Sequence, residues 1–307
     1  MEKDAELCGV IPVNKPIGWT SFDVVAKLRG ILKIKRLGHA GTLDPMAEGG
    51  LSGFVGKATK ACDILPETAK VYLAGFRLGI TTDTQDITGT VLSENRARAS
   101  LEQLEAAKSK FIGDIMQLPP MYSAVKVGGK KLYELARQGK TIEREAKPRH
   151  IDNIDITEYD SEKREGKMCV SVSRGTYIRT LINDIGEYLG CGGVMTSLTR
   201  TEAAGFSLEQ CRSLEEIQQA AEENRLGGII KPIESCFLGE YAKLRLGEKS
   251  TALYKNGVKL RLEQVGIKDT ESAHSRIFCV FGFAGEFLGL GKADSRRNEF
   301  RSVKNFY

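Results

Sequence analysis

The stretch GHAGTLDPMAEGG, residues 38–50, holds the single aspartate Asp44 in a frame of glycines, followed directly by Pro45. Three interpretations of Asp44 are open from these residues. An Asp-Pro pair among glycines commonly forms a turn. A phosphate-binding loop is less consistent, because neither the P-loop pattern nor the dinucleotide fingerprint is matched. A catalytic carboxylate on a rigid loop is the third, since glycines let a ligand approach the backbone and proline fixes the chain.

Basic residues gather in two segments. Residues 121–150 contain eight Lys or Arg against three Glu, with Tyr122 and Tyr133 among them. The second cluster lies near the C-terminus and consists of Arg296, Arg297, Arg301 and Lys304 beside Phe300, Phe306 and Tyr307. Cations next to aromatic rings suit phosphate contact combined with base stacking. A solvated charged face accounts equally well for either cluster taken alone.

The composition is that of a folded globular protein. The chain has 307 residues, 41% hydrophobic and 28% charged, with a formal net charge of +5. Seven cysteines, an odd number without a C-x-x-C pair, support neither a disulfide framework nor a zinc site. The acidic N-terminus does not resemble a signal peptide, and no run approaches the ~20 apolar residues that span a bilayer. We therefore expect a cytoplasmic protein with reduced thiols, without metal or membrane contact.

The elements around Asp44 can be placed by periodicity and capping. Residues 9–13 form a short apolar run, which predicts a buried strand before Asn14. Thr20 or Ser21 can cap a helix that carries Val25, Leu28 and Leu32 on one face. Further along, the pattern predicts a helix over 56–65, a two-sided buried strand over 70–79, and helices after the capping boxes that begin at Ser100 and Ser213.

The rest of the chain predicts hairpins, one more helix and a β-rich end. Gly128 and Gly129 indicate a hairpin that leads into a short helix. Alternating residues over 150–173 indicate a second hairpin, and a helix follows over 176–190. Short strands are expected around 243–246, 277–283 and 287–290. The sequence therefore predicts an α+β fold with a small all-β unit from about Leu238.

Four segments resemble one enzyme family. The segment GHAGTLDPMAEGGLSGFVGKATK looks like the catalytic segment of tRNA pseudouridine synthases of the bacterial TruB type. The segments KPIGWTSFDVV, MYSAVKVGGKKLYELARQG and SRGTYIRTLINDIGEYLG resemble other motifs of the family, in the family's order. The stretch after residue 237 is similar to the PUA-type RNA-binding tail of such enzymes. The family usually has Leu-Pro where this chain has Leu51-Ser52, which predicts a looser turn there.

The resemblance implies a fold and a domain division. It implies a pseudouridine synthase fold, with a central mixed or antiparallel sheet flanked by helices. A catalytic domain over 1–237 and a PUA-like RNA-binding domain over 238–307 are expected.

The resemblance also implies a reaction. It implies isomerisation of uridine to pseudouridine in the T-loop of tRNA, at the position conventionally numbered 55, after the nucleotide flips out. No redox change or energy source is required, so no cofactor is expected. Asp44 matches the essential aspartate. It could attack the ribose C1′ atom or remove the C2′ proton, and both roles stay open.

Site residues follow from the same resemblance. Arg179 matches the arginine that would offset the desolvation of Asp44. His39 matches a T-loop contact, Tyr72 a ring that stacks on the base, and Tyr177 and Leu198 other pocket positions. The supporting motif comprises Lys15, Pro16, Gly38, Gly41, Leu43 and Pro45. Phosphate contacts are expected from Lys126, Lys130, Lys131, Arg137 and Lys140.

Two rival functions share these motifs. An RNA-guided (H/ACA-type) pseudouridine synthase depends on partner proteins and usually has an extra N-terminal segment, whereas this chain reaches its first motif at residue 15. A non-catalytic tRNA-binding or tRNA-folding protein would not need Asp44, Arg179 and Tyr72 together. We therefore expect a stand-alone enzyme, a monomer that acts on the T-arm without an obligate protein partner.

Overall fold

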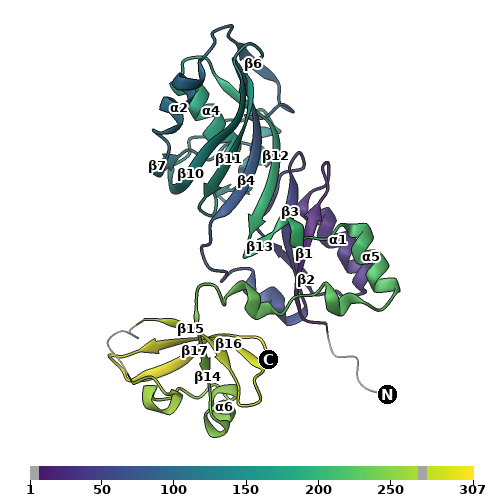
Figure 1. The fold of residues 1–307 in the computed structure, drawn as a ribbon, viewed down its shortest axis with the longest axis vertical. Coiled ribbons are helices and arrows are strands. Elements are labelled where there is room, and N and C mark those ends of the chain that lie inside the picture. Colours follow the sequence, from purple (N-terminus) through teal and green to yellow (C-terminus); the bar gives the residue numbers. More distant parts are fainter. Residues whose placement is uncertain (1–6, 269–274) are drawn as a thin grey trace.

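Two β-sheets organise the chain in the computed structural model, which describes residues 7–268 and 275–307 (Figure 1). The larger sheet has nine strands, with the order β1-β3-β12-β4-β11-β10-β7, and β2 and β13 pair beside this path. The smaller sheet has the order β14-β15-β16-β17. The acidic N-terminus assessed above begins with residues 1–6, which lie outside the described residues.

The N-terminal elements form one end of the large sheet. Strand β1 (Gly9–Lys15) pairs antiparallel with β3 (Glu48–Val55), and β2 (Leu37–Ala40) pairs with the far half of β3. Helix α1 (Ser21–Leu32) begins at Thr20, whose side chain accepts a hydrogen bond from the Asp23 amide in a capping box. Val25 and Leu28 are buried on the sheet side of the helix, as expected. Helix α5 (Leu214–Glu222) lies beside α1 (Figure 1).

The other end of the sheet carries the main core. Strand β4 (Lys70–Leu78) lies between β12 (Gly193–Ala203) and β11 (Glu165–Val172), followed by β10 (Lys147–Asp160) and β7 (Gly113–Gln117). Helices α4 (Ile178–Tyr188) and α2 (Leu101–Lys108) cover this end and contact each other. Apolar residues from β4, β10, β11 and α4 form one buried cluster between them.

Strand β12 joins the two ends. It pairs antiparallel along β4 and parallel with the start of β3, where Thr199 and Arg200 lie opposite Glu48 and Gly49. The sheet is therefore mixed. Residues 193–203 were not predicted as a strand, because register shifts after Met195 and Arg200 interrupt the alternation of side chains.

Two short hairpins form separate two-stranded sheets. Strands β5 (Ile80–Thr82) and β6 (Val91–Glu94) form a hairpin whose loop contains residues 83–90. Strands β8 (Lys126–Val127) and β9 (Lys130–Lys131) form the hairpin expected at Gly128, and α3 (Leu132–Ala136) follows it.

The C-terminal unit has its own small core. Strands β14 (Ala242–Arg245), β15 (Ile277–Phe281), β16 (Phe287–Asp294) and β17 (Glu299–Asn305) form its sheet, with α6 (Glu248–Lys255) against it. Leu246, Tyr254, Val280 and Phe300 are buried inside the unit.

A second apolar cluster connects this unit to the rest of the chain. Phe237 lies at the end of the connecting 3-10 turn Ile233–Cys236 and is fully buried. It packs against Phe287 and Phe306 of the C-terminal unit, and the same cluster includes Val10 and Phe54 of the large sheet. The two units therefore share buried apolar side chains.

The α+β class, the mixed sheet flanked by helices and the β-rich C-terminal unit are confirmed. Three local predictions were wrong. Residues 56–61 form a 3-10 helix, Gly56–Ala61, rather than an α-helix. Ser52 lies inside β3, opposite Pro12 and Ala40, so no turn exists there to be loosened. Phe300 and Phe306 are buried, so neither ring is free to stack on a base. Among the described residues, no helix is long and apolar enough to cross a membrane.

Candidate active site

Asp44 lies on the loop that joins β2 to β3. The Ala47 amide donates to the Asp44 carbonyl at 3.0 Å, and the Gly18 amide donates to the Pro45 carbonyl at 2.8 Å. The Ser21 hydroxyl donates to the Leu43 carbonyl, and the Leu43 amide donates to the Ser21 Oγ. The loop is therefore fastened on both sides of Asp44 to the start of α1.

Lys15 also holds the loop that carries Asp44. Its side chain is fully buried, and its Nζ atom donates to the carbonyls of Trp19 at 2.6 Å and Pro16 at 3.0 Å. The Pro45 carbonyl lies 3.5 Å away. Burial lowers the pKa of Lys15 to about 8, against the opposing effect of the Asp44 carboxylate. Lys15 therefore holds backbone carbonyls next to Asp44 and is not accessible to a macromolecule.

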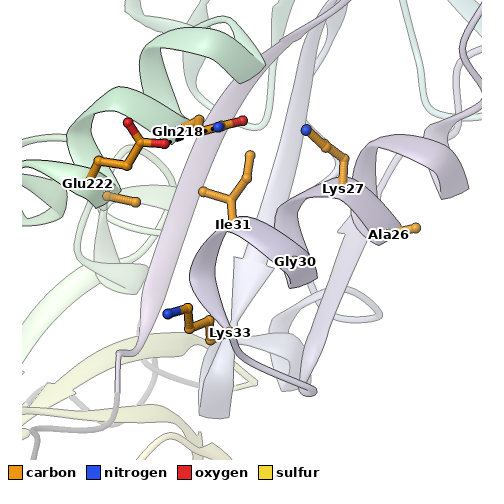
Figure 2. A pocket seen from close by; sticks show the side chains of 8 residues that line it. Ala26, Lys27, Gly30, Ile31, Lys33, Gln218 and Glu222 are labelled. Carbon is orange, nitrogen blue, oxygen red and sulfur yellow. Dashed lines mark hydrogen bonds between the residues drawn. The ribbon is translucent and has the colours of Figure 1, made fainter.

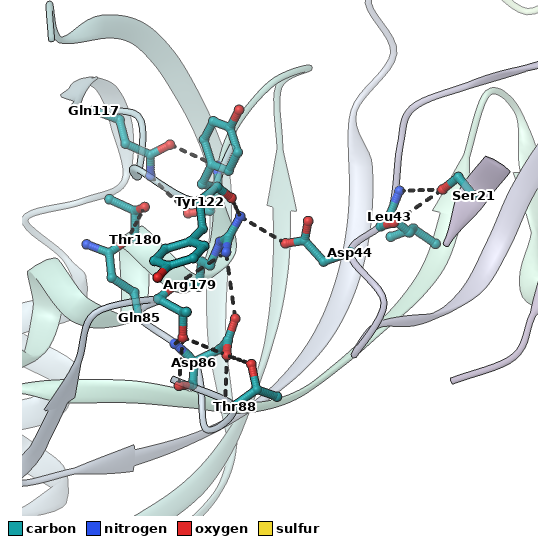
Figure 3. Close-up of polar contacts among 12 residues, drawn as sticks. Ser21, Leu43, Asp44, Gln85, Asp86, Thr88, Gln117, Tyr122, Arg179 and Thr180 are labelled. Atoms are coloured by element: carbon teal, nitrogen blue, oxygen red, sulfur yellow. Dashed lines mark hydrogen bonds and ion pairs between the residues drawn. The ribbon is translucent and has the colours of Figure 1, made fainter. Parts of the chain in front are cut away.

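Arg179 reaches Asp44 from the other end of the sheet. Arg179 is the second residue of α4, and its Nη2 atom lies 3.1 Å from the Oδ2 atom of Asp44 (Figure 3). Only 5% of the Arg179 side chain is exposed, whereas 40% of the Asp44 side chain is. The pair therefore presents a carboxylate on the surface of the site with its guanidinium partner behind it.

A second carboxylate anchors the arginine. The Nη1 atom of Arg179 lies 3.6 Å from the Oδ2 atom of Asp86, which is as buried as Arg179 (Figure 3). The other oxygen of Asp86 accepts from the Thr88 amide at 2.9 Å and from the Thr84 hydroxyl at 2.9 Å. Arg179 Nη2 also donates to the Tyr122 carbonyl at 2.7 Å. Because each partner is itself held, the guanidinium has one fixed orientation toward Asp44.

The environment shifts the pKa of Asp44 upward. Desolvation is the main cause, although part of the Asp44 side chain faces solvent. The Arg179 guanidinium opposes the shift, and the Asp86 carboxylate adds to it. Arg179 therefore limits the rise without cancelling it. The carboxylate keeps a higher basicity than that of an exposed aspartate.

The N-terminus of α4 is clamped to β7. The Tyr177 amide donates to the Gln117 Oε1 at 2.8 Å, and the Gln117 Nε2 donates to the Tyr177 carbonyl at 3.0 Å. The Thr180 hydroxyl donates to Gln85 at 2.7 Å, which links α4 to the 83–90 loop as well (Figure 3). The Tyr177 ring lies 5.8 Å from the guanidinium carbon of Arg179. These bonds fix the position from which Arg179 extends.

Tyr72 and Leu198 lie on one face of the sheet. Arg200 of β12 lies directly opposite Tyr72 of β4, and Leu198 lies opposite Ala74. Residues two apart on a strand share a face. Tyr72 and Leu198 are 7% and 8% exposed, so only a small part of each side chain reaches solvent. Both predicted pocket residues therefore share a wall, and Arg200 belongs to it.

Arg200 holds the glycines around the loop that carries Asp44. It is fully buried, its Nη2 donates to the Gly41 carbonyl at 2.8 Å, and its Nε donates to the Gly50 carbonyl at 2.7 Å. Gly41 has φ +72°, and Gly49 has φ +101° with the Arg200 backbone where a Cβ would lie. Gly38 lies in β2, where a Cβ would make only ordinary contact with Cys62. Glycine at 49 is therefore required by the close approach of β12, and glycine at 41 is favoured by its left-handed backbone.

His39 borders the loop beside an exposed ring. Its Nε2 atom lies 3.3 Å from the Thr42 hydroxyl, and the Phe22 ring meets it edge to face at 5.3 Å. Burial and the nearby Arg200 lower the pKa of His39, which favours the neutral imidazole. Phe22 is 69% exposed. His39 is thus a neutral ring next to the loop that carries Asp44.

Tyr122 and Tyr133 make the contacts that position the basic segment, residues 121–150. Lys131 and Arg137 flank the Tyr133 ring at 5.4 Å each. Tyr122 donates its hydroxyl to Asp83 and offers its carbonyl to Arg179, which ties the segment to the site. The remaining predicted phosphate contacts are exposed and project from the hairpin or from the end of the short helix: Lys126, Lys130 and Lys140.

Two charged residues of the site were not predicted from the sequence. Asp86 lies in the threonine-rich stretch TTDTQDITG, and such a concentration of turn-forming side chains was a signal that a built loop was present. Arg200 follows Leu198 by two residues and so shares its face. Nothing in its sequence surroundings distinguishes it from a surface arginine.

A separate surface hollow lies away from Asp44. Figure 2 shows it between α1 and α5, lined by Lys27, Ile31, Gln218 and Glu222 among others. It shares no lining residue with the Asp44 site, and its polar groups are those of two solvated helix faces. We assign no function to it.

Two family models match most of the large-sheet unit. Residues 29–178 match the N-terminal domain of TruB family pseudouridylate synthases, and residues 179–237 match the C-terminal domain of tRNA pseudouridylate synthase B. These matches contain Asp44, Tyr72, Asp86, Arg179 and Arg200.

Similar proteins match over nearly their whole length. tRNA pseudouridine synthase B of Clostridium novyi is 42% identical over 288 residues, which are 94% of this chain and 96% of that protein. The enzyme of the same name from Fusobacterium nucleatum is 43% identical over 288 residues, with the same coverage. That of Lachnoclostridium phytofermentans is 42% identical over 304 residues, 97% of this chain and 99% of that protein.

Solved structures share the fold. The crystal structure of a Cbf5-Nop10-Gar1 complex contains a chain with a TM-score of 0.74 and 26% identity, covering 97% of this chain and 85% of that one. The crystal structure of the archaeal box H/ACA sRNP Nop10-Cbf5 complex gives a TM-score of 0.72 at 25% identity, covering 97% and 86%. With the fold and these matches in agreement, the chain belongs to the TruB family of pseudouridylate synthases.

Proposed function

We propose that this enzyme converts uridine to pseudouridine in tRNA, at the T-loop position conventionally numbered 55, with Asp44 as its single catalytic carboxylate. The observation that carries the proposal is the Asp44 carboxylate, part-exposed and 3.1 Å from a buried guanidinium. Relatives at 40–43% identity bear the name tRNA pseudouridine synthase B, which supports tRNA as the substrate. The finer assignment to the T-loop rests on the resemblance of the motifs.

The reaction needs one acid group and a closed pocket. The bond between the ribose C1′ and the uracil N1 breaks, the base turns, and a bond forms between C1′ and C5. The C5 proton is released and N1 ends protonated, so atoms balance without oxidant, water or cofactor. Asp44 acts on the ribose in its ionised form, and Arg179 keeps enough of it ionised while the substrate covers it.

The wall around Asp44 suits an extruded base. A flipped nucleotide costs a few kcal/mol of lost stacking, which aromatic and apolar contacts can return. We assign the Tyr72 ring to stacking on the uracil and Leu198 and Tyr177 to enclosing it. His39 would contact the T-loop at the entrance. Lys15, Pro16, Gly38, Gly41, Leu43 and Pro45 hold the loop and do not touch the RNA in this assignment.

Affinity would come from the basic segment. Lys126, Lys130, Lys131, Arg137 and Lys140 are assigned to phosphates of the T-arm, where they add salt-dependent binding and little sequence selectivity. The C-terminal unit, which we place at 238–307 after a catalytic domain over 1–237, is assigned to tRNA binding outside the T-arm. The exposed cations Arg296, Arg297 and Arg301 then carry this contact without help from the buried aromatic rings.

The enzyme is proposed to act as a monomer without an obligate protein partner. The test is incubation of the purified protein with an unmodified tRNA transcript, without cofactor or partner, followed by mapping of pseudouridine. The expected product is pseudouridine at the T-loop position in the wild type and none with Asp44→Asn. Modification at another site would contradict the assignment to position 55. Dependence on an added protein or guide RNA would favour the RNA-guided class, and binding without any product would favour a tRNA-folding protein.

A further inference from the structure

Arg200 lies beside the loop that carries Asp44, and within the described residues its side chain donates hydrogen bonds only to neutral atoms. Arg200 is fully buried, and both of its hydrogen-bond acceptors are backbone carbonyls. A buried cation that is hydrogen-bonded but not matched by an anion is costly. Holding the geometry of the Asp44 loop does not by itself explain why a charged residue is buried at position 200.

Lys70 lies against the same spot. A Cβ placed on Gly41 would lie 3.1 Å from the Lys70 Nζ and 3.2 Å from the Arg200 Nη1, so both cationic groups border this one glycine. Desolvation together with Arg200 and Arg174 lowers the pKa of Lys70 to about 8. Each charge that acts on Lys70 is thus positive, and bringing an anion there would relieve the repulsion.

Among the described residues, Arg200 has one nitrogen atom free to donate a hydrogen bond next to Gly41. Within the part of the chain that the structure describes, the buried Nη1 atom of Arg200 has no hydrogen-bond partner. Arg174 is exposed on the turn before α4, and Lys70 is half-buried at the start of β4. Lys70 and Arg200 therefore border a position where no side chain projects, because residue 41 is glycine, and the exposed Arg174 is near enough to act on the Lys70 charge.

The position also fits the reacting nucleotide. Lys70 and Tyr72 are two apart on β4 and share a face, and the Arg200 guanidinium lies 6.0 Å from the Tyr72 ring centre. Gly41 is three residues from Asp44, a span of at most about 11 Å. An anion at Lys70 would therefore lie about one nucleotide from a base on Tyr72.

We propose that Lys70 and Arg174, with Arg200 behind them, bind the backbone phosphate adjacent to the target uridine. This proposal rests on the proposed function, since it takes RNA as the ligand and Tyr72 as the stacking ring. Lys70 and Arg174 would contact the phosphate, and Arg200 is a positioning residue that adds positive potential and fixes Gly41. The basic segment would hold the T-arm stem, whereas this group would hold the strand at the flipped nucleotide.

The test measures binding of a T-arm stem-loop RNA at several salt concentrations, in the Asp44→Asn background so that no product forms. We expect Lys70→Met and Arg174→Gln each to weaken binding about tenfold. Each should also reduce the slope of log Kd against log salt concentration by about 0.7, the loss of one phosphate contact. Lys163→Met is the matched control: Lys163 forms an exposed pair with Asp160 at the hairpin tip, at the opposite end of β4 from Lys70. The control should bind as the parent does.

A modified RNA then locates the phosphate. Stem-loops with one uncharged methylphosphonate linkage, 5′ or 3′ of the target uridine, are compared with the unmodified RNA. We expect one of the two to lose affinity for the parent protein, and Lys70→Met to show no further loss with that RNA. Lys70→Arg should restore binding of the unmodified RNA, because it keeps the charge.

Several outcomes would overturn this inference. They are unchanged binding by both variants, a weakened Kd with an unchanged salt slope, and additive losses with the methylphosphonate RNAs. Arg174→Gln changes an exposed side chain, so it remains a test if Lys70→Met does not fold. If the wild-type enzyme neither binds nor converts the stem-loop, the proposed function fails. If it converts the RNA and the losses are additive, only the phosphate site fails.

Discussion

The Nη2 atom of Arg179 lies 3.1 Å from the Oδ2 atom of Asp44, and the two residues come from opposite ends of the nine-stranded sheet. Asp44 follows β2 at the N-terminal end, whereas Arg179 begins the helix that covers the other end. Strand β12 holds the ends together through its parallel pairing with β3. The distance between the two charges is therefore set by the whole sheet.

Asp44→Asn tests the carboxylate. We expect no release of label from uracil C5, with a stem-loop Kd within a few-fold of wild type, because the amide keeps the shape and loses the charge. The pKa of Asp44 is raised in the folded protein, so its ionised form costs stability as the pH rises through the window between the ordinary and the raised value. The variant should therefore melt no lower than wild type at pH 7. A clearly lower Tm there would show that the ionised form is net stabilising.

Asp86→Asn tests the anchor of Arg179. We expect kcat to fall by about 10- to 100-fold with little change in KM, because the guanidinium loses its second carboxylate and its fixed orientation. The Asp86 charge also raises the pKa of Asp44. The acid limb of the kcat profile should accordingly move to lower pH. Asp155→Asn, on the exposed side of β10, is the control and should leave rate and profile unchanged.

Arg179→Lys tests geometry against charge. A lysine has one ammonium group, which cannot contact Asp44, Asp86 and the Tyr122 carbonyl at once. We expect kcat to fall by about 100-fold or more, with the acid limb moved to higher pH because the ammonium group cannot hold the close contact that the guanidinium makes with Asp44. Steady-state rates from pH 5 to 9 measure both effects. Near-wild-type turnover would show that charge alone suffices.

Lys15→Met tests the support of the loop. The variant leaves the carbonyls of Pro16 and Trp19 without their donor, so we expect a stability loss of about 1–3 kcal/mol. In wild type the pKa of Lys15 falls from 10.5 to about 8 on folding, so the unfolded chain holds more protons between these values. Wild-type stability therefore gains with pH across that window. Denaturation at pH 7.5 and 10 should show a larger deficit of the variant at pH 10, and an equal deficit would contradict the assigned shift.

Part of this structure follows from local sequence rules, and part does not. The capping boxes at Ser100 and Ser213 and the alternation in β10 and β11 depend on neighbours in the chain, and both were predicted. Strand β3 was not, because its glycines disfavour a strand by propensity. Gly49 is there because the Arg200 backbone occupies the space of a Cβ, and that contact joins residues 151 positions apart.

The same reason separates the site residues that were predicted from those that were not. Asp44 and Arg179 carry recognisable motifs, so the resemblance identified them. Asp86 and Arg200 have their meaning only in the folded chain, one as the second partner of a guanidinium and the other as a buried cation. Burial of an unpaired arginine contradicts the usual preference of charged residues for the surface, so no pattern predicts it.

Phe237 packs between the large sheet and the rings of Phe287 and Phe306. This packing affects how the protein unfolds on heating. Neither unit can melt without stripping apolar surface from the other, so heating should give one cooperative calorimetric peak instead of two. Cutting the chain after residue 237 would likewise expose apolar side chains on the remaining unit. The C-terminal unit thus contributes to the stability of the large-sheet unit. Its proposed contribution to RNA affinity therefore has to be measured with surface charge changes in the intact protein.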